Sequence, residues 1–226
     1  MNNLVIYHHL GLGDHFICNG LVREWAARYD TVALFCKSHN AETVKQMYND
    51  LNINFLVGGD DFAHKFLSNN KTYDSLCVGF NNLRESSGKF DKQFYDLAGV
   101  SFDKRWSYFK VCRNPQKEKS LVFKANLPRK FALVHEDVSR GFKIDTSKIN
   151  LPIVRLEKRD DYTMIDWLAV ADLAQEIHVI DSSFMFLIDS VYIKVPLYIH
   201  RYSRRNPDWQ LPTLKKNWIV LQNLTS

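Results

Sequence analysis

The sequence predicts an α/β protein of two small lobes, each built on a parallel sheet, that face each other across a cleft. Short β-branched runs alternate with longer stretches of helical period, which is typical of β-α units on a parallel sheet. A charged stretch with two prolines, residues 101–130, interrupts this alternation, and the same pattern then restarts. We therefore expect a first lobe at residues 1–115 and a second at residues 116–226.

Apolar runs bounded by polar residues predict the strands, and apolar positions of helical period predict the helices. In the first lobe the strands are expected at 4–8, 31–36, 53–57 and 75–80, and the helices at 14–28, 41–51 and 90–100. In the second lobe the strands are expected at 131–135, 152–156, 177–180, 196–200 and 218–221, and the helices at 164–174 and 183–193. Both lobes have the pattern of a Rossmann-like unit, and residues 101–130 are expected to connect them.

Composition narrows the classes of function. The 226 residues include 30 basic and 25 acidic side chains, so the net charge of +5 permits a polyanionic partner without requiring one. Four cysteines lie far apart without metal-ligand spacing, which argues against structural zinc and a disulfide-rich secreted scaffold. No run approaches the roughly 18 apolar residues that a membrane span needs. We expect a soluble cytoplasmic protein with free thiols, without bound metal, and at most in peripheral contact with a membrane.

The first motif is the turn "HHLGLGDHF", residues 8–16, between a strand and a helix. Gly11 and Gly13 suggest a dinucleotide site, but Phe16 stands where the third glycine belongs, and Asp14 would repel a phosphate. The carboxylate of Asp14 is instead placed to act as a general base, with three neighbouring imidazoles able to tune or replace it. These are His8, His9 and His15. The alternative is that Asp14 only caps the helix and that the histidines end the strand.

The second motif is "VIDSSFMFLIDSV", in which a strand ends at Asp181 and an almost wholly apolar helix begins. The backbone N–H groups of Ser183 and Phe184, with the hydroxyls of Ser182 and Ser183, form a predicted diphosphate site at the start of this helix. A plain serine cap on a core helix is the alternative interpretation.

The third motif, "VHEDVSRGFK", carries Ser139, Arg140 and Lys143 after a strand of the second lobe. A hydroxyl and two cations in this position can hold phosphate oxygens, although a solvated basic loop would have the same sequence. A later basic cluster, "HRYSRRNPDW" at residues 200–209, suits an acidic acceptor or no ligand at all. No stacking or helical pattern around it favours nucleic acid.

Together the three stretches resemble one family. "GLGDHFICNGLVREW" resembles the G-D-x-[aliphatic]-x-x-x-x-x-[aliphatic]-R segment that begins bacterial lipopolysaccharide heptosyltransferases and related transferases of the GT-B fold. "VSRGFK" is similar to their Thr-Thr-Arg-x-x-Lys loop, and "VIDSSFMFLIDSV" to their Asp-Thr-Gly-x-x-His segment, in the same order. The chain departs from these motifs at Val138, Ser183 and Phe186, and it is shorter than a usual two-lobe member.

The resemblance implies a metal-independent, inverting glycosyltransferase that needs no cofactor. It would move a hexose, heptose or deoxyhexose from a nucleotide-diphospho sugar to a hydroxyl of a glycan acceptor. Asp14 would be the base, with His9, Gly11 and Gly13 on the acceptor side. Ser139, Lys143 and residues 181–183 would hold the donor diphosphate. By its position at the end of a strand, Glu157 is a candidate ribose partner. The alternatives are a nucleotide-sugar epimerase of the same fold and a non-catalytic nucleotide- or glycan-binding module.

Overall fold

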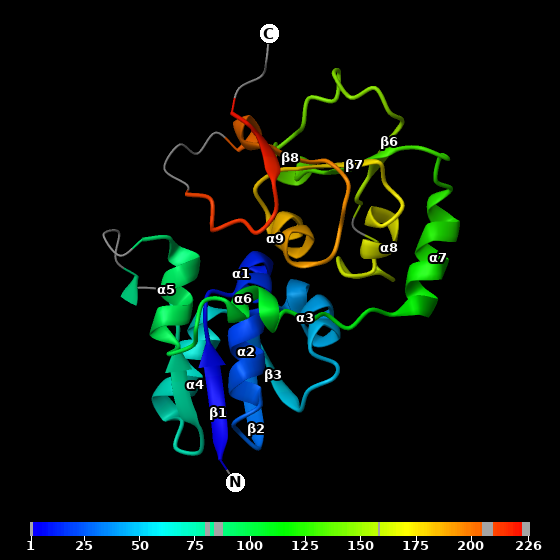
Figure 1. The fold of residues 1–226 in the computed structure, drawn as a ribbon. Helices are drawn as coiled ribbons and strands as arrows, with labels where there is room; N and C mark the ends of the chain where they lie inside the picture. Colours follow the sequence, from blue (N-terminus) through cyan, green and yellow to red (C-terminus); the bar gives the residue numbers. More distant parts are fainter. Residues whose placement is uncertain (1, 80–81, 84–87, 158, 205–209, 223–226) are drawn as a thin grey trace. The chain divides into compact units, whose positions relative to one another are not determined.

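The computed structural model describes residues 2–79, 82–83, 88–157, 159–204 and 210–222. The chain forms two compact units, Met1–Cys112 and Arg113–Ser226, each with its own parallel sheet (Figure 1). The boundary predicted from the sequence lies near residue 115. No helix within the described residues is long and apolar enough to cross a membrane.

The first unit is built on a sheet of order β3-β2-β1-β4, in which all pairings are parallel. Its strands are β1 (Asn3–Tyr7), β2 (Thr31–Cys36), β3 (Ile53–Val57) and β4 (Asp74–Cys77). The central strands β1 and β2 are almost wholly buried, whereas β3 and β4 at the edges are partly exposed. All four predicted strands are present, and continuous apolar runs identify the two central ones because these are buried on both faces.

The helices of the first unit are α1 (Leu12–Ile17), α2 (Asn19–Ala26), α3 (Ala41–Met47), α4 (Asp60–Asn69), α5 (Phe90–Leu97) and α6 (Lys104–Ser107). The helix predicted at 14–28 divides into α1 and α2 at Cys18, and α4 was not predicted. Gly20 on α2 explains how closely α6 packs there, since a Cβ at this position would lie 2.0 Å from the carbonyl oxygen of Lys104. Only glycine permits this approach of two backbones.

Residues 101–112 belong to the first unit, so the prediction that residues 101–130 merely connect the lobes was wrong. The guanidinium of Arg105 on α6 is buried and forms an ion pair with the buried carboxylate of Asp91 on α5. Lys104 Nζ lies 2.6 Å from Glu24 Oε2 on α2. Lys104 and Arg105 thus attach α6 to the unit, because each meets an opposite charge on another helix.

The second unit has a parallel sheet of order β6-β5-β7-β8-β9. Its strands are β5 (Ala132–His135), β6 (Ile153–Arg155), β7 (Glu176–Val179), β8 (Leu197–His200) and β9 (Trp218–Leu221), and its helices are α7 (Pro115–Ala125), α8 (Leu168–Ala171) and α9 (Ser183–Ser190). Helix α7 lies within the predicted connection. Its start follows the usual rules, since Asn114 Oδ1 accepts a hydrogen bond from the N–H of Lys117 and proline takes the first turn.

Strand order locates the places where ligands bind in such sheets. Successive connections reverse direction next to β1 in the first unit and next to β5 in the second. In open α/β sheets the crevice at the carboxyl end of the strands at this point is the usual ligand site. The pairs β1/β4 and β5/β7 therefore mark one candidate edge in each unit. The three motifs identified from the sequence follow β1, β5 and β7 directly.

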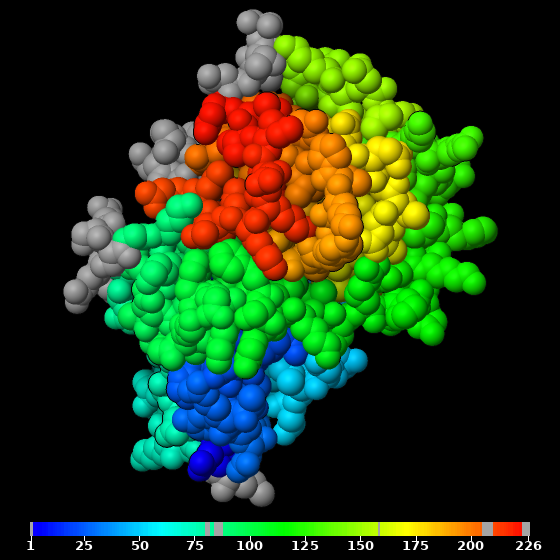
Figure 2. Space-filling model, in the orientation of Figure 1, coloured from blue at the N-terminus to red at the C-terminus, as the bar shows by residue number. Residues whose placement is uncertain are grey.

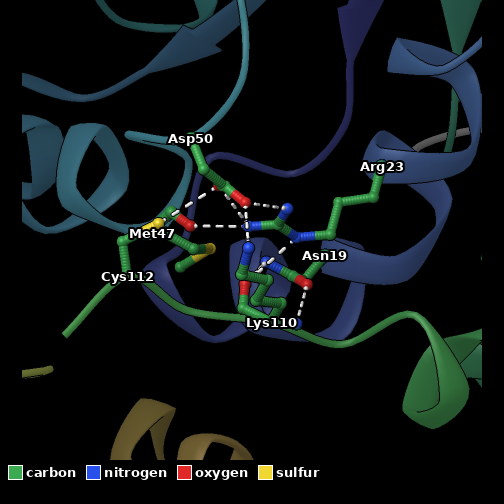
Figure 3. Close-up of polar contacts among 6 residues, drawn as sticks. All are labelled: Asn19, Arg23, Met47, Asp50, Lys110 and Cys112. Carbon is green, nitrogen blue, oxygen red and sulfur yellow. Dashed lines mark hydrogen bonds and ion pairs between the residues drawn. The ribbon is translucent and has the colours of Figure 1, made fainter.

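A single guanidinium joins three parts of the first unit (Figure 3). Arg23 on α2 donates to both carboxylate oxygens of Asp50 at 3.1 and 2.9 Å, and to the carbonyl oxygen of Met47 at 3.0 Å. Its Nε and Nη2 also donate to the carbonyl oxygen of Lys110 at 3.1 and 2.8 Å. This fork fixes α2, the end of α3 and the strand-free segment around residue 110 to one another.

We expect Arg23→Met to lower the free energy of unfolding by about 2–4 kcal/mol, because it removes the side-chain donor of the Met47 carbonyl oxygen and the two guanidinium hydrogen bonds of Asp50, which keeps only Lys110 and Cys112. Urea denaturation at pH 7 measures the loss. Arg28→Met is the matched control, since the Arg28 side chain is 47% exposed and its removal should cost less than about 1 kcal/mol. Equal effects of the two variants would contradict the central role of Arg23.

The same contact should weaken in acid. Burial by itself raises the pKa of Asp50, but hydrogen bonds from Arg23, Lys110 and Cys112 outweigh it and hold this pKa below its usual value. Its stabilising effect is thus complete at neutral pH and disappears as the pH falls below about 4. The stability difference between the wild type and Asp50→Asn should shrink accordingly between pH 7 and pH 3. A constant difference would argue against the ion pair.

Candidate functional site

Asp14 lies at the carboxyl edge of the first sheet, in the first turn of α1. Its carboxylate folds back over the preceding turn, where a Cβ on Gly11 would come within 2.7 Å of Oδ2. Gly11 is exposed and Gly13 is half-buried. Burial raises the pKa of Asp14 to about 7, although its own N–H and the charge of Lys37 act in the opposite direction. The carboxyl group thus changes charge near neutral pH, as a general base should.

The three histidines near this turn differ in accessibility. His8 and His15 are fully buried and pack edge to face with their ring centroids 4.5 Å apart. Burial lowers the pKa of His8 to about 4 and that of His15 well below its usual value, so both imidazoles are neutral. His9 is half-buried and packs edge to face on Phe94. Of the three, His9 is therefore the one whose ring is accessible.

Other polar side chains at the same edge were not predicted. Tyr7 at the end of β1 donates a hydrogen bond to Asp60 Oδ1 at 3.0 Å, and its hydroxyl lies 3.4 Å from His64 Nε2. Lys37, which follows β2, lies 3.4 Å from Asp60 Oδ2. The sequence "GGDDF", which spans the start of α4, does carry the signal of a helix start, with glycines followed by two acidic residues.

On the second unit, Asp181 ends the segment after β7 and is 2% exposed. Burial raises its pKa, while Arg204 and Arg201 partly oppose the shift. Arg204 Nε lies 3.7 Å from Asp181 Oδ1, and its Nη1 donates to the carbonyl oxygen of Asp181 at 2.6 Å. Arg201 Nε lies 3.9 Å from Asp181 Oδ2. The carboxylate therefore orients two cations at the β5/β7 edge, whereas the sequence placed both arginines in a basic cluster that suited an acidic acceptor or no ligand.

The first turn of α9 has no side-chain cap. Ser182 is the N-cap residue but forms no capping hydrogen bond, because its hydroxyl is bonded to His135 Nδ1 at 3.0 Å. Burial lowers the pKa of His135 to about 4, so this imidazole is neutral. Ser183 is half-buried and Phe184 is fully buried. A serine that does not cap its helix leaves backbone N–H groups for another acceptor.

The predicted phosphate loop is ordered by its own aspartate. Asp137 Oδ1 accepts from the Ser139 hydroxyl at 2.7 Å, and Oδ2 accepts from Arg140 Nε at 2.6 Å. Arg140 and Arg204 both lie over the Phe142 ring, at 5.1 and 5.6 Å from its centroid. The loop is thereby held beside the arginine that contacts Asp181.

The remaining predicted residues of the second unit are exposed. Lys143 forms no hydrogen bond or ion pair within the described part of the chain. Glu157, beyond β6, lies 3.8 Å from Arg159 Nη2. Of the basic cluster at 200–209, Arg201 and Arg204 turn toward Asp181, and positions 205–209 lie outside the described residues.

The two edges have complementary chemistry. The first carries a carboxylate that titrates near neutral pH, suited to accept a proton from a hydroxyl. The second carries arginines and free helix N–H groups, suited to bind an anion. Among the described residues, no group of three or more His, Cys, Asp and Glu side chains is arranged to hold a metal ion.

No family model and no curated protein sequence matches the chain. Solved structures do match it. A glycosyl transferase family 9 protein from Veillonella parvula has a TM-score of 0.61 and 12% identity, over 97% of this chain and 85% of its own. The ADP-heptose lipopolysaccharide heptosyltransferase II of E. coli has a TM-score of 0.61 and 13% identity, over 100% and 92%.

A third match is more distant. The iron-containing dodecameric glycosyltransferase TibC of enterotoxigenic E. coli has a TM-score of 0.52 and 9% identity, and the alignment covers 87% of this chain and 57% of that protein. At such identities the likeness concerns the fold. The chain therefore has the two-unit, Rossmann-like GT-B fold of heptosyltransferase-like glycosyltransferases, as its motifs predict.

Proposed function

We propose that this protein is a glycosyltransferase that moves a sugar from a nucleotide-diphospho sugar to a hydroxyl of a glycan acceptor. The observation that carries the proposal is Asp14, a partly buried carboxyl group with a pKa near 7 at the ligand edge of this fold. An ordinary helix-capping aspartate stays ionised at neutral pH and gains stability from the helix dipole. Asp14 instead resists ionisation, which makes its carboxylate a stronger base.

In the proposed reaction Asp14 takes the proton of the acceptor hydroxyl. The acceptor oxygen attacks the anomeric carbon of the donor, and the bond from that carbon to the diphosphate oxygen breaks. The electron pair leaves with the diphosphate, which Arg204, Lys143 and the N–H groups at the start of α9 stabilise. Attack opposite the leaving group inverts the anomeric centre, and these cations would allow transfer without a metal ion.

The comparison with solved structures suggests only which donor to assay first. One similar structure is named for ADP-heptose, so ADP-heptose is the first donor to assay. Other heptosyl, hexosyl and deoxyhexosyl donors follow. Nucleotide-sugar epimerisation is the second candidate, because it can share this fold. Incubating each donor without acceptor separates the two, since only an epimerase would interconvert the sugar.

Asp14→Asn should abolish transfer while leaving nucleotide affinity within about twofold of the wild type, because it removes the base and preserves the shape of the side chain. A coupled assay for released nucleoside diphosphate measures transfer, and calorimetry measures binding. Asp61→Asn, an exposed aspartate at the start of α4, is the matched control and should transfer normally. Wild-type turnover by Asp14→Asn would remove Asp14 from the mechanism.

The same substitution should stabilise the fold in alkaline solution. The folded protein raises the pKa of Asp14 from 3.8 to about 7, so this group stabilises the fold fully below pH 4, and the effect is lost as the pH rises through 7. At pH 8 Asp14→Asn should therefore unfold with a free energy on the order of 1–4 kcal/mol higher than the wild type. At pH 4 the difference should vanish. Urea denaturation at both values decides this.

The pH profile of transfer tests the base directly. Because Asp14 must be ionised, kcat/KM for the acceptor should rise about tenfold per pH unit below pH 7 and level off above it. Nucleotide affinity measured over the same range provides the control. A rate that stays constant from pH 5 to pH 8 would contradict a base with this pKa.

Arg204→Met should weaken nucleoside diphosphate binding by about 1–3 kcal/mol, which corresponds to roughly 5- to 150-fold in Kd. ADP, GDP and UDP are the probes, and calorimetry gives the affinity. Arg129→Met is the matched control, since Arg129 is exposed at the opposite end of β5. Failure of every nucleotide to bind the wild type would favour a module that binds glycan without catalysis.

A further inference from the structure

Helix α7 carries an exposed aromatic side chain on the face that points away from the second unit. Phe123 is 86% exposed, more than any other large apolar side chain among the described residues. Glu118 and Leu121 on the same helix are buried, so α7 packs on the unit through the side opposite Phe123. Figure 1 shows α7 beside α8 at the margin of the second unit, and Figure 2 shows this green region projecting from that margin.

Basic side chains accompany this phenylalanine. Lys119 precedes Phe123 by four residues, which places both side chains on the same side of the helix. Exposed cations occupy five positions on the helix and directly after it: Lys117, Lys119, Lys124, Arg129 and Lys130. Phe123 and these five cations are called the α7 face below.

The charge of the α7 face is largely uncompensated. Four of its cations form no side-chain hydrogen bond or ion pair with the described residues: Lys117, Lys119, Arg129 and Lys130. Lys124 lies 3.8 Å from Asp161 Oδ2. The single acid of the helix, Glu118, is buried and accepts a hydrogen bond from Arg113 Nε at 2.7 Å, so it does not neutralise the outer lysines. The α7 face therefore keeps a net positive charge.

An exposed aromatic ring among unpaired cations fits a lipid surface with anionic headgroups. The cations attract the headgroup phosphates, and the ring leaves water by entering the boundary between headgroups and acyl chains. A nucleic acid would match the charge, but stacking of successive bases needs several aromatic side chains, and Phe123 is the one aromatic residue of α7. The ring therefore favours the lipid surface over a nucleic acid.

We propose that the α7 face docks the second unit on an anionic lipid surface, with its cations at the headgroups and Phe123 inserted between them. The surface needs neither Asp14 nor the diphosphate edge, so the inference goes beyond the proposed transfer. Each cation held near an anionic leaflet strengthens binding about fivefold. Because the attraction is mainly electrostatic, the docking is reversible and weakens as the salt concentration rises.

Sedimentation of the full chain with lipid vesicles tests this surface. The anionic vesicles contain phosphatidylcholine and phosphatidylglycerol in a ratio of about two to one, and vesicles of phosphatidylcholine alone are the reference. We expect the wild type to bind the anionic vesicles about tenfold or more tightly than the neutral ones, because only the former attract the cations. This preference should fall as salt is added.

Phe123→Ser should weaken binding to the anionic vesicles about tenfold, because it removes the inserted ring. Lys119→Glu should weaken it about twentyfold, because it replaces an attraction by a repulsion. The matched controls are Tyr192→Ser, which removes an aromatic ring that is 77% exposed elsewhere on the second unit, and Lys65→Glu, which makes the same charge change on α4 of the first unit. Both controls should bind within about twofold of the wild type, since charges far from the bilayer are screened.

Three outcomes would overturn the proposal: the wild type does not bind anionic vesicles, it binds both kinds of vesicle equally, or Phe123→Ser and Lys119→Glu bind as the wild type does. Equal losses in Lys119→Glu and Lys65→Glu would also overturn it, since they would reflect net charge and not a docking face.

Oligomeric state separates the other occupant of the α7 face, a second copy of this chain. If size-exclusion chromatography shows a dimer that Phe123→Ser converts to a monomer, the face is a subunit interface and the proposal is wrong. Phe123 and Lys119 are both exposed, so their variants should keep the fold, as judged by circular dichroism. Vesicle binding in a protein that transfers no sugar would contradict the proposed function and leave the α7 face standing.

Discussion

The fold of the first unit depends on one charged contact, the fork of Arg23 against Asp50 and the carbonyl oxygens of Met47 and Lys110. Helices α1 and α2 follow each other with only Cys18 between them, so whatever holds α2 also holds Asp14 at the edge of the sheet. An apolar contact could slide by a rotamer change, whereas a planar guanidinium with five donors fits its acceptors in one orientation. In the first motif Arg23 follows Asp14 by nine residues, and this contact gives a structural explanation for that spacing.

The ionised form of Asp14, which the proposed chemistry requires, is the form that destabilises the fold. The protein removes water from a carboxyl group and gives it few partners, which makes the ionised form costly to fold around. At the β5/β7 edge of the second unit, Asp181 is also buried, but it lies near two arginines that it orients. The carboxyl group of Asp14 has few charged neighbours, whereas that of Asp181 has two arginines beside it. The difference lies in the neighbours and not in the residue type.

Much of the fold could be predicted from the sequence because parallel strands in the centre of a sheet are continuous apolar runs. All nine predicted strands are present, and the errors concern helices. Helices α4, α6 and α7 are rich in charge, and α6 is fixed by Asp91 and Glu24, partners that sequence spacing does not reveal. Motif order indicated both candidate edges. It did not indicate Arg204, since its contacts with Asp181 arise only when β7, β8 and η5 (Arg201–Ser203) come together.

The boundary between the two units falls between Cys112 and Arg113. On one side, Lys110 and Cys112 are bonded to Asp50 of the first unit, at 2.6 and 3.1 Å (Figure 3). On the other, Arg113 lies 2.7 Å from Glu118 and 2.8 Å from Asp172, both in the second unit. Each flank is therefore tied to its own unit, so the chain passes from one unit to the other between residues 112 and 113 without a separate linker.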